Sequence, residues 1–293
     1  MDTRITTPPD VQAWCDGHLQ RVEAALDAWV HPQAPAGLAD AMRYAVLGGG
    51  KRLRPLLVLA TCEAVQGEPT AALRAACAVE LIHAYSLVHD DMPCMDNDIL
   101  RRGKPTVHVK FGQAQALLAG DALQALAFEI LTADDAVPGA RQAQLCRLLA
   151  RASGCDGMAG GQAIDLASVG QKLSEERLSE MHRLKTGALL QASVMMGAAC
   201  GDAPPRATST LQTYGAAIGL AFQVVDDILD VTADAATLGK TAGKDASGAL
   251  ARLRVQLARA SPQRLAGQRP GRHDRAAGPG RYGGAAWFLN LRI

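Results

Sequence analysis

The chain has 293 residues, of which 48% are hydrophobic and only 4% aromatic, and its formal net charge at pH 7 is +1. This length allows one large domain or two small ones, and a composition rich in Ala, Leu and Gly favours packed helices over strands. The seven cysteines are scattered and form no C-x-x-C pair, which argues against a disulfide framework and against a zinc site.

The first predicted helices lie before residue 66. Apolar residues recur at helical spacing in "PPDVQAWCDGHLQRVEAALDAWV", and Asp10 stands where an N-cap is expected. The next segment, "GLADAMRYAVLGGGKRLRPLLVLATCEAVQ", predicts two helices separated by Gly48–Gly50. The N-terminus has no signal-peptide pattern and no run of eighteen apolar residues occurs, so we expect a cytoplasmic protein without stable membrane insertion.

Long helical patterns occupy most of the remaining chain up to residue 232. The segment that opens at Ser174 has Glu175 and Glu176 in its first turn, where acidic side chains suit the helix dipole. Neither convincing alternating strands nor internal repeats occur, so residues 1–245 are predicted to form a single all-α domain. The predicted helices span about 70–92, 113–132, 140–152, 157–167, 174–200 and 206–232.

An acidic cluster follows the predicted helix at 70–92, in "LIHAYSLVHDDMPCMDNDILRRGKP". Asp90, Asp91, Asp96 and Asp98 would repel one another without a compensating cation. Pro93 interrupts the helix, and the chain must bend if Asp96 is to lie near Asp90. His83 precedes Asp90 by two helical turns on nearly the same face, about 10 Å away along the axis. A lone histidine in an apolar helix is usually a core residue, and the alternative, which the shared face with Asp90 supports, is a role at the site.

A second acidic motif, "FQVVDDILD", places Asp226 and Asp230 one turn apart on a helix. Two carboxylates at this spacing can bind Mg²⁺, which takes few carboxylates and completes its coordination with water and phosphate oxygens. The alternative is a solvated acidic stripe. The surrounding sequence is apolar nearly all round, however, and buried like charges without a counter-ion are costly.

Basic residues accompany both features. Lys51, Arg52 and Arg54 surround the glycine turn of "GGGKRLRP", and Arg101 and Arg102 follow the first acidic cluster. Glycine lets backbone N–H groups approach an anion, and arginine binds phosphate through paired donors. "GGGK" alone is a weak signal without P-loop spacing. Together these groups indicate one diphosphate bridged to metal and a second held by basic residues alone.

The sequence resembles the trans-polyprenyl synthase family, and within it the bacterial farnesyl diphosphate synthases, from about residue 10 to 245. The motifs that carry the resemblance occur in the family's order. They are "GGGKRLRP", "LIHAYSLVHDDMPCMDNDILRRGKPTVHVKFG", "LAGDAL", "KTGALL", "FQVVDDILD" and "LGKTAGKD".

The resemblance implies a homodimer of antiparallel helical bundles, each around a deep central cavity (the isoprenoid synthase fold). It implies that the site binds three Mg²⁺ ions. The implied catalytic residues are Asp90, Asp91, Asp96, Lys185, Thr186, Gln223 and Asp226. The implied metal ligands are Asp90, Asp96, Asp226 and Asp230. The implied contacts of the allylic diphosphate are Arg101, Lys185, Thr186, Gln223 and Lys240. The implied contacts of isopentenyl diphosphate are Gly50, Lys51, Arg54, His83 and Arg102.

The implied reaction joins isopentenyl diphosphate to dimethylallyl or geranyl diphosphate. Metal and cations stabilise the departing diphosphate, the isopentenyl double bond attacks the carbocation, and a proton is lost. Product length in the family depends on the residues four and five before the first aspartate, here Ser86 and Tyr85. An aromatic residue at 85, with Pro93 and Cys94 inserted in the motif, resembles the type that makes farnesyl (C15) product; geranylgeranyl (C20) is the alternative.

A terpene cyclase would share the fold but would have no use for the basic set around "GGGKRLRP", which argues against that reading. A non-catalytic partner subunit is disfavoured because both aspartate motifs are intact.

Residues 246–293 depart from the family pattern. They contain nine arginines, no lysine, one aspartate and no glutamate, a charge of +8, so residues 1–245 carry −7. Prolines at 262, 270 and 279 discourage helices. Nucleic-acid binding is disfavoured because no aromatic residue interleaves the arginines before Tyr282 and Trp287. We interpret the segment as an atypical, frameshifted tail replacing the closing helices. An inactive remnant is therefore an alternative.

Overall fold

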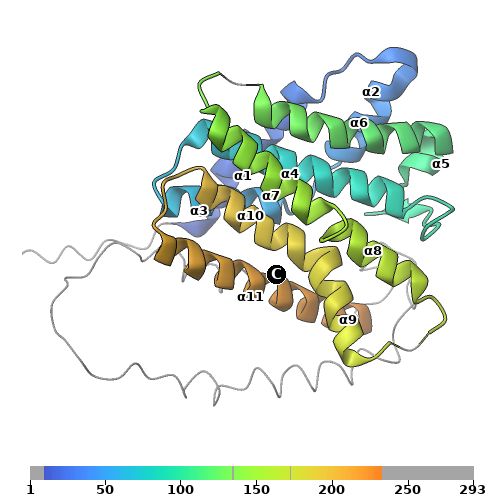
Figure 1. The fold of residues 1–293 in the computed structure, drawn as a ribbon. Coiled ribbons are helices and arrows are strands. Elements are labelled where there is room, and N and C mark those ends of the chain that lie inside the picture. Colours follow the sequence, from blue (N-terminus) through green and yellow to red (C-terminus); the bar gives the residue numbers. More distant parts are fainter. Residues whose placement is uncertain (1–9, 134, 172, 233–293) are drawn as a thin grey trace, which may run out of the picture.

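The computed structural model describes residues 10–133, 135–171 and 173–232, with residues 223–232 described by their backbone alone (Figure 1). This part of the chain is a bundle of helices with one short hairpin, so the predicted all-α fold is confirmed. The elements are α1 (Val11–Trp29), η1 (Pro35–Gly37), α2 (Leu38–Val46), α3 (Leu53–Ala64), α4 (Pro69–Asp90), β1 (Leu100–Arg101), β2 (Lys104–Pro105), α5 (Val107–Phe111), α6 (Gln113–Thr132), α7 (Gly139–Ser153), α8 (Met158–Ala167), α9 (Glu175–His182), η2 (Arg183–Gly187), α10 (Ala188–Ala199) and α11 (Pro205–Thr232).

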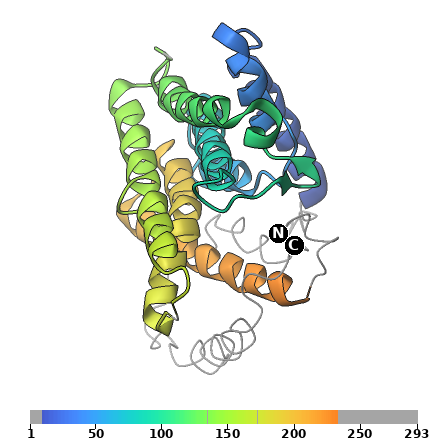
Figure 2. The ribbon, with the colours of Figure 1, turned by 90° about the vertical axis from the view of Figure 1, so that its right-hand side faces the viewer.

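Helix α4 lies at the centre of the bundle. In Figure 2 it is surrounded by α6, by the first two helices and by the later helices on the opposite side. It packs against α6, α3 and α10, and also against α1, α2 and α7. Its buried residues face all directions and include alanines at 71, 72, 75, 76, 78 and 84. A helix that is apolar all round belongs in a core, and small alanine side chains let the neighbouring helices approach it closely.

Capping residues fix several helix boundaries as the sequence predicts. The Asp10 carboxylate accepts hydrogen bonds from the backbone N–H groups of Gln12 and Ala13, so Asp10 is the N-cap of α1. Ser174 caps α9 in the same way, accepting from the backbone of Arg177. Helices α2 and α3 are separated at the predicted glycines, where Gly49 has a φ of +83°, a conformation that glycine adopts readily.

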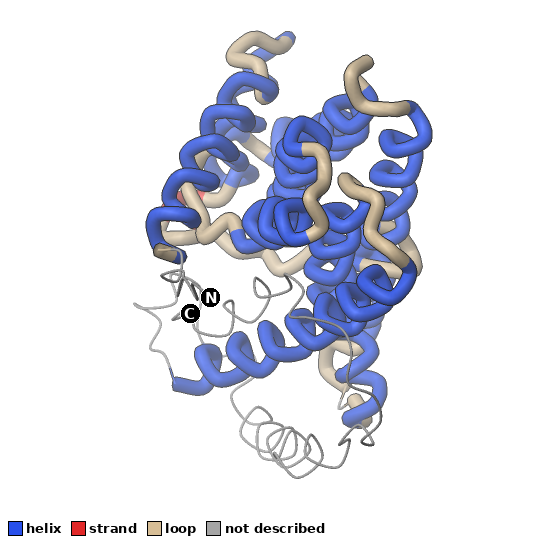
Figure 3. Tube along the Cα trace, turned by 90° about the vertical axis from the view of Figure 1, so that its left-hand side faces the viewer, coloured by secondary structure: helices blue, strands red, loops and turns tan. Residues whose placement is uncertain are grey.

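The hairpin between α4 and α5 was not predicted. Strands β1 and β2 pair antiparallel, with Leu100 opposite Pro105 and Arg101 opposite Lys104. In Figure 3 the strands are a small red segment among the blue helices. The turn consists of Arg102 and Gly103, with φ values of +53° and +72°. Positive φ at both central positions is the geometry of the tight turns that match the twist of a hairpin. Two-residue strands are too short to give an alternating pattern in the sequence.

The helical pattern at 174–200 is interrupted in the structure. Between α9 and α10 the chain forms η2, a π-helical turn that contains Lys185 and Thr186. Helix α8 lies directly against this turn, because a methyl group added at Gly161 would stand 2.2 Å from the backbone nitrogen of Lys185. Such π-helical turns occur frequently at functional sites.

Two helices, α4 and α6, have the length and apolar composition of membrane spans. In α4, 67% of the most apolar window is buried inside the bundle, as expected for the core helix of a globular fold. In α6 the buried share is 39%, and Leu117 and Leu118 are exposed. Helix α6 therefore presents an apolar outer face.

Candidate active site

The first aspartate motif forms the turn that follows α4. Asp90 is the last residue of α4 and Asp91 caps it. After Pro93 the chain folds back, and the backbone N–H of Asp96 donates a hydrogen bond of 2.9 Å to the carbonyl of Asp90. The prediction that the chain bends to return Asp96 to Asp90 is confirmed. Two carboxylate-bearing residues are thereby brought to one end of the central helix.

The Asp90 carboxylate lies between a polar side chain and a cation from other helices. Gln162 of α8 donates a hydrogen bond of 2.6 Å to Oδ1, and Nζ of Lys185 lies 4.0 Å from Oδ2. Burial raises the pKa of Asp90; the positive charge of Lys185 opposes this rise and the negative charge of Asp96 adds to it. A carboxyl group in such surroundings gains from a further cation.

Lys185 is held by two acidic side chains. Its Nζ lies 2.7 Å from Oδ2 of Asp165 on α8, in addition to its contact with Asp90. Burial lowers the pKa of Lys185, but the charge of Asp90 and the hydrogen bond to Asp165 outweigh burial and raise it, so the ammonium stays charged.

Gln162 and Asp165 were not predicted from the sequence. The available signal was the presence of two polar residues three apart, and therefore on one helix face, within the small, apolar segment "GMAGGQAIDLA".

Asp91 binds Arg101. The Nε and Nη2 atoms of Arg101 lie 2.6–2.9 Å from the two carboxylate oxygens, a forked ion pair. Asp91 is 2% exposed. Burial raises its pKa, and the hydrogen bonds and charge of Arg101 act against that rise. This pair fixes strand β1 to the end of α4.

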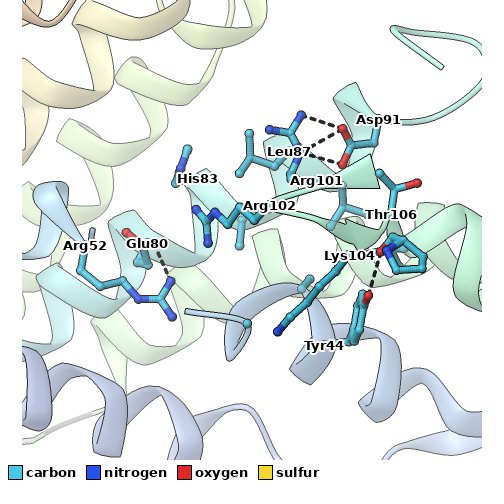
Figure 4. Close-up of a pocket in the computed structure, with 16 residues that line it drawn as sticks. Tyr44, Arg52, Glu80, His83, Leu87, Asp91, Arg101, Arg102, Lys104 and Thr106 are labelled. Atoms are coloured by element: carbon cyan, nitrogen blue, oxygen red, sulfur yellow. Dashed lines mark hydrogen bonds and ion pairs between the residues drawn. The ribbon is translucent and has the colours of Figure 1, made fainter. Parts of the chain in front are cut away.

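A pocket of about 70 Å³ opens beside this ion pair, between α2, α4 and the hairpin (Figure 4). Figure 4 shows that Arg101 extends toward Asp91, whereas its neighbour Arg102 extends on the side of His83. The lining residues are Tyr44, Ala45, Gly48, Arg52, Glu80, His83, Ala84, Leu87, Val88, Asp91, Arg101, Arg102, Lys104, Pro105, Thr106 and Val107.

The pocket brings together several residues of the predicted basic set. The guanidinium of Arg102 donates a hydrogen bond to the carbonyl of Gly49 and lies against Gly50. The pKa of His83 is lowered well below its ordinary value, first by burial and then by the charges of Arg54 and Arg102. His83 is therefore a neutral imidazole among guanidinium groups.

The remaining basic residues of "GGGKRLRP" lie in different surroundings. Lys51 is exposed and Arg54 is half-buried. Arg52 is 4% exposed and lies 2.7 Å from carboxylate oxygens of both Glu23 and Glu80, so it connects α1 to α4. The role of Glu80 was also not predicted from the sequence. The available signal was a single glutamate within an apolar helix. A buried carboxylate needs such a partner.

The two residues expected to set product length lie on α4. The ring of Tyr85 contacts that of His89 edge-on, with centroids 5.7 Å apart. Burial raises the pKa of Tyr85, and a hydrogen bond with the side chain of Gln124 on α6 counteracts this. The Ser86 hydroxyl donates to the carbonyl of His83 at 2.8 Å.

The second aspartate motif is described only in part. Backbone positions 223, 226 and 230 belong to α11, but the side chains of Gln223, Asp226 and Asp230 lie outside the described residues, as does all of Lys240. Helix α11 packs against η2, which carries Lys185 and Thr186. Within the described ranges no group of three or more His, Cys, Asp or Glu side chains could hold a metal ion.

The described donors nevertheless suit magnesium. Asp90 and Asp96 would supply two carboxylates, and Mg²⁺ takes few carboxylates and retains several waters or phosphate oxygens. The electrostatic surroundings of Asp90 also favour an additional cation.

Known proteins are similar to this chain in sequence. A probable farnesyl diphosphate synthase of Sinorhizobium fredii is 52% identical over 243 residues, covering 80% of this chain and 73% of that protein. The large subunit 1 of a heterodimeric geranylgeranyl pyrophosphate synthase of Arabidopsis thaliana is 50% identical over 230 residues, covering 76% of this chain. This chain spans only 62% of that plant protein.

Solved structures share the fold. The geranyltransferase of Helicobacter pylori, complexed with magnesium and isoprenyl diphosphate, is 35% identical, with a TM-score of 0.77 and coverage of 89% of each chain. An FPP/GFPP synthase of Zymomonas mobilis is 42% identical, with a TM-score of 0.73, covering 86% of this chain and 91% of that one. Residues 35–265 match the polyprenyl synthetase family. The chain therefore belongs to the polyprenyl synthetase family, a family of prenyltransferases.

Proposed function

We propose that this protein is a farnesyl diphosphate synthase, which joins isopentenyl diphosphate to dimethylallyl and geranyl diphosphate. The observation that carries the proposal is the opposite orientation of two consecutive arginines. Arg101 extends to the aspartate side and Arg102 to the glycine turn and His83. One hairpin thus faces an acidic site suited to a metal-bridged diphosphate and a basic site suited to a second one.

On the acidic side we assign Asp90, Asp96, Asp226 and Asp230 as ligands of three Mg²⁺ ions. When bound, these ions neutralise the charge that develops on the allylic diphosphate as it departs. Asp91 positions Arg101 through their forked ion pair. The remaining allylic diphosphate contacts are assigned to Arg101, Lys185, Thr186, Gln223 and Lys240.

On the basic side, isopentenyl diphosphate binds to Lys51, Arg54 and Arg102, with Gly50 presenting backbone and His83 donating from its neutral ring. The low pKa of His83 suits this role, because the imidazole adds a hydrogen-bond donor without adding a fourth repelling cation.

The reaction follows from the two sites. The allylic C–O bond breaks and leaves a carbocation, and the isopentenyl double bond forms the new C–C bond. A proton then leaves the carbon next to the cationic centre and passes to the released diphosphate. Thr186 and Gln223 face the cation with oxygen dipoles and form no covalent bond to it.

Tyr85 supports a C15 product, because a bulky ring one turn before the aspartates, packed against His89, would block further elongation. A C20 product is the second candidate, since geranylgeranyl pyrophosphate synthases are among the similar proteins. We further propose a cytoplasmic homodimer that binds no nucleic acid and inserts into no membrane.

The test is to incubate the purified protein with isopentenyl diphosphate, geranyl diphosphate and Mg²⁺ and to separate the products by chain length. Farnesyl diphosphate is the expected product. Asp90→Asn should reduce the rate at least about a hundredfold, because it removes a metal ligand, whereas Asp202→Asn, at an exposed surface position, should leave it unchanged. Longer products would overturn the role of Tyr85. No product from a folded protein would favour the inactive remnant.

A further inference from the structure

We propose that the Tyr44 hydroxyl is a latch that positions the β1–β2 hairpin, and through it Arg102, for binding of isopentenyl diphosphate. Tyr44 lies on α2, outside every motif that the sequence analysis singled out. Its hydroxyl donates a hydrogen bond of 2.8 Å to the carbonyl of Pro105, at the end of β2 (Figure 4). The proposal rests on the proposed function for the identity of the ligand.

The hairpin needs such an anchor because it is short. Its strands have two residues each, and an isolated two-stranded hairpin is at best marginally stable in water. Arg102 adds to the cost, because its φ of +53° is unfavourable for a residue with a side chain. Contacts with the rest of the molecule must therefore hold the turn in place.

The register explains why the anchor lies at Pro105. Across an antiparallel hairpin, directly opposed residues alternate between pairs that exchange hydrogen bonds and pairs that do not. Arg101 and Lys104 flank the two-residue turn as a bonded pair, and the backbone N–H of Thr106 donates to the carbonyl of Ile99 at 3.1 Å. Pro105 lies between these positions, so its carbonyl points away from β1. Tyr44 supplies the donor that the hairpin itself cannot provide.

The two strands are thus held by different residues. Strand β1 is fixed by the fork between Arg101 and Asp91, and β2 by Tyr44. The Tyr44 ring is itself held, because Nζ of Lys110 lies 4.0 Å from its centroid and Phe111 contacts it edge-on at 5.4 Å. Loss of the hydroxyl should loosen β2 and leave the turn held only by the hydrogen bond from Arg102 to the carbonyl of Gly49, while the Arg101–Asp91 fork stays closed.

The test uses Tyr44→Phe in the full chain, which keeps the ring and its packing. The KM for isopentenyl diphosphate should rise about fivefold, the equivalent of one lost hydrogen bond, while kcat and the KM for geranyl diphosphate change less than about twofold. Hydrogen exchange should be faster at the amides of residues 99–106 and unchanged in α4. Tyr214→Phe is the matched control, because the buried Tyr214 hydroxyl has no hydrogen-bond partner among the described residues.

Two results would overturn the latch. Unchanged exchange at residues 99–106 would show that the hydrogen bond does not hold the hairpin, and faster exchange throughout α4 would show that Tyr44 only stabilises the fold. If the wild-type chain makes no product, the proposed function fails, and the exchange comparison still decides whether the latch exists.

Discussion

At the scale of single residues, the end of α4 that carries the candidate site has one side chain in an unusual protonation state and another in a buried ion pair. His83 is neutral among arginines, and Asp91 is buried against Arg101. Burying a titratable group costs free energy that the same group at the surface would not cost. Each of the two arrangements should therefore have a measurable effect on stability.

The first prediction concerns pH. Because the pKa of His83 is lowered in the folded state, the unfolded chain binds more protons below about pH 6.5 and stability falls as the pH falls. This contribution to stability is present above the ordinary unfolded pKa of about 6.5 and is lost as the pH falls below it. His83→Asn should remove this contribution. Urea unfolding at pH 7.5 and 5.5 measures it, with His31→Asn at an exposed position as control. Equal acid sensitivity in wild type and His83→Asn would contradict the prediction.

The second prediction compares two aspartate–arginine pairs. Asp91→Asn leaves the partly buried Arg101 without its charged partner and should lower the free energy of unfolding by about 3 kcal/mol. Asp202→Asn removes an exposed partner of Arg141, at 3.1 Å, and should cost less than about 1 kcal/mol. Chemical denaturation of both variants measures the two losses in free energy of unfolding. Equal losses would show that burial of the Asp91–Arg101 pair does not matter for its contribution to stability.

At the scale of elements, the packing of α6 against α4 fixes the position of the aspartate motif. The His89 ring, next to Asp90, lies over Gly120, and its Nε2 is 3.0 Å from the carbonyl of Leu117. A methyl group added at Gly120 would stand 2.0 Å from that Nε2. The glycine in "LAGDAL" is therefore required by close approach between the two helices.

The third prediction follows from this contact. Gly120→Ala should lower the free energy of unfolding by about 1–3 kcal/mol, because the His89 ring must move. Gly17→Ala, within α1, has no atom within 4 Å of the added methyl group and should instead stabilise the protein by about 0.5–1 kcal/mol. Thermal unfolding of the two variants should shift in opposite directions. A stabilised Gly120→Ala variant would show that His89 moves at no cost.

The elements also show what the sequence could predict and why. The helical pattern at 113–132 predicts α6 with the bounds that the structure shows, because the spacing of apolar residues and the residues that flank a helix are local signals. The hairpin and the π-helical turn were missed, because contacts from α2, α4 and α8 shape them. The same reason explains which residues of the candidate site could be predicted. The aspartate motifs are visible in the sequence, whereas Gln162 gains its role only because the fold places it within hydrogen-bonding distance of Asp90.

At the scale of the whole molecule, the apolar outer face of α6 is expected to be a contact surface for another protein chain. Leu117 and Leu118 are 46% and 52% exposed, and Val109 of neighbouring α5 is 49% exposed. A second copy of the chain is the occupant consistent with the proposed homodimer, because a face of this kind is stable when another apolar face covers it.

The fourth prediction tests this surface. Leu118→Lys should weaken the dimer at least about tenfold, since it places a charge within a desolvated contact. Val169→Lys, at a more exposed apolar residue after α8, should leave it intact. Sedimentation equilibrium across a range of concentrations measures both dissociation constants. A monomeric wild type, or equal effects of the two variants, would exclude this face as the dimer contact.

The hairpin that carries Arg101 and Arg102 has one further consequence, which concerns the free energy of binding the two proposed substrates. Because a single short hairpin presents both guanidinium groups, Arg101 from β1 and Arg102 from the turn, a ligand on either side would restrict the motion of the hairpin in advance for the other. Thermodynamic linkage then requires the two substrates to raise each other's affinity by the same factor. Titration of isopentenyl diphosphate with and without an unreactive allylic analogue would measure that factor, and the Tyr44 hydroxyl would be one of the groups that set its size.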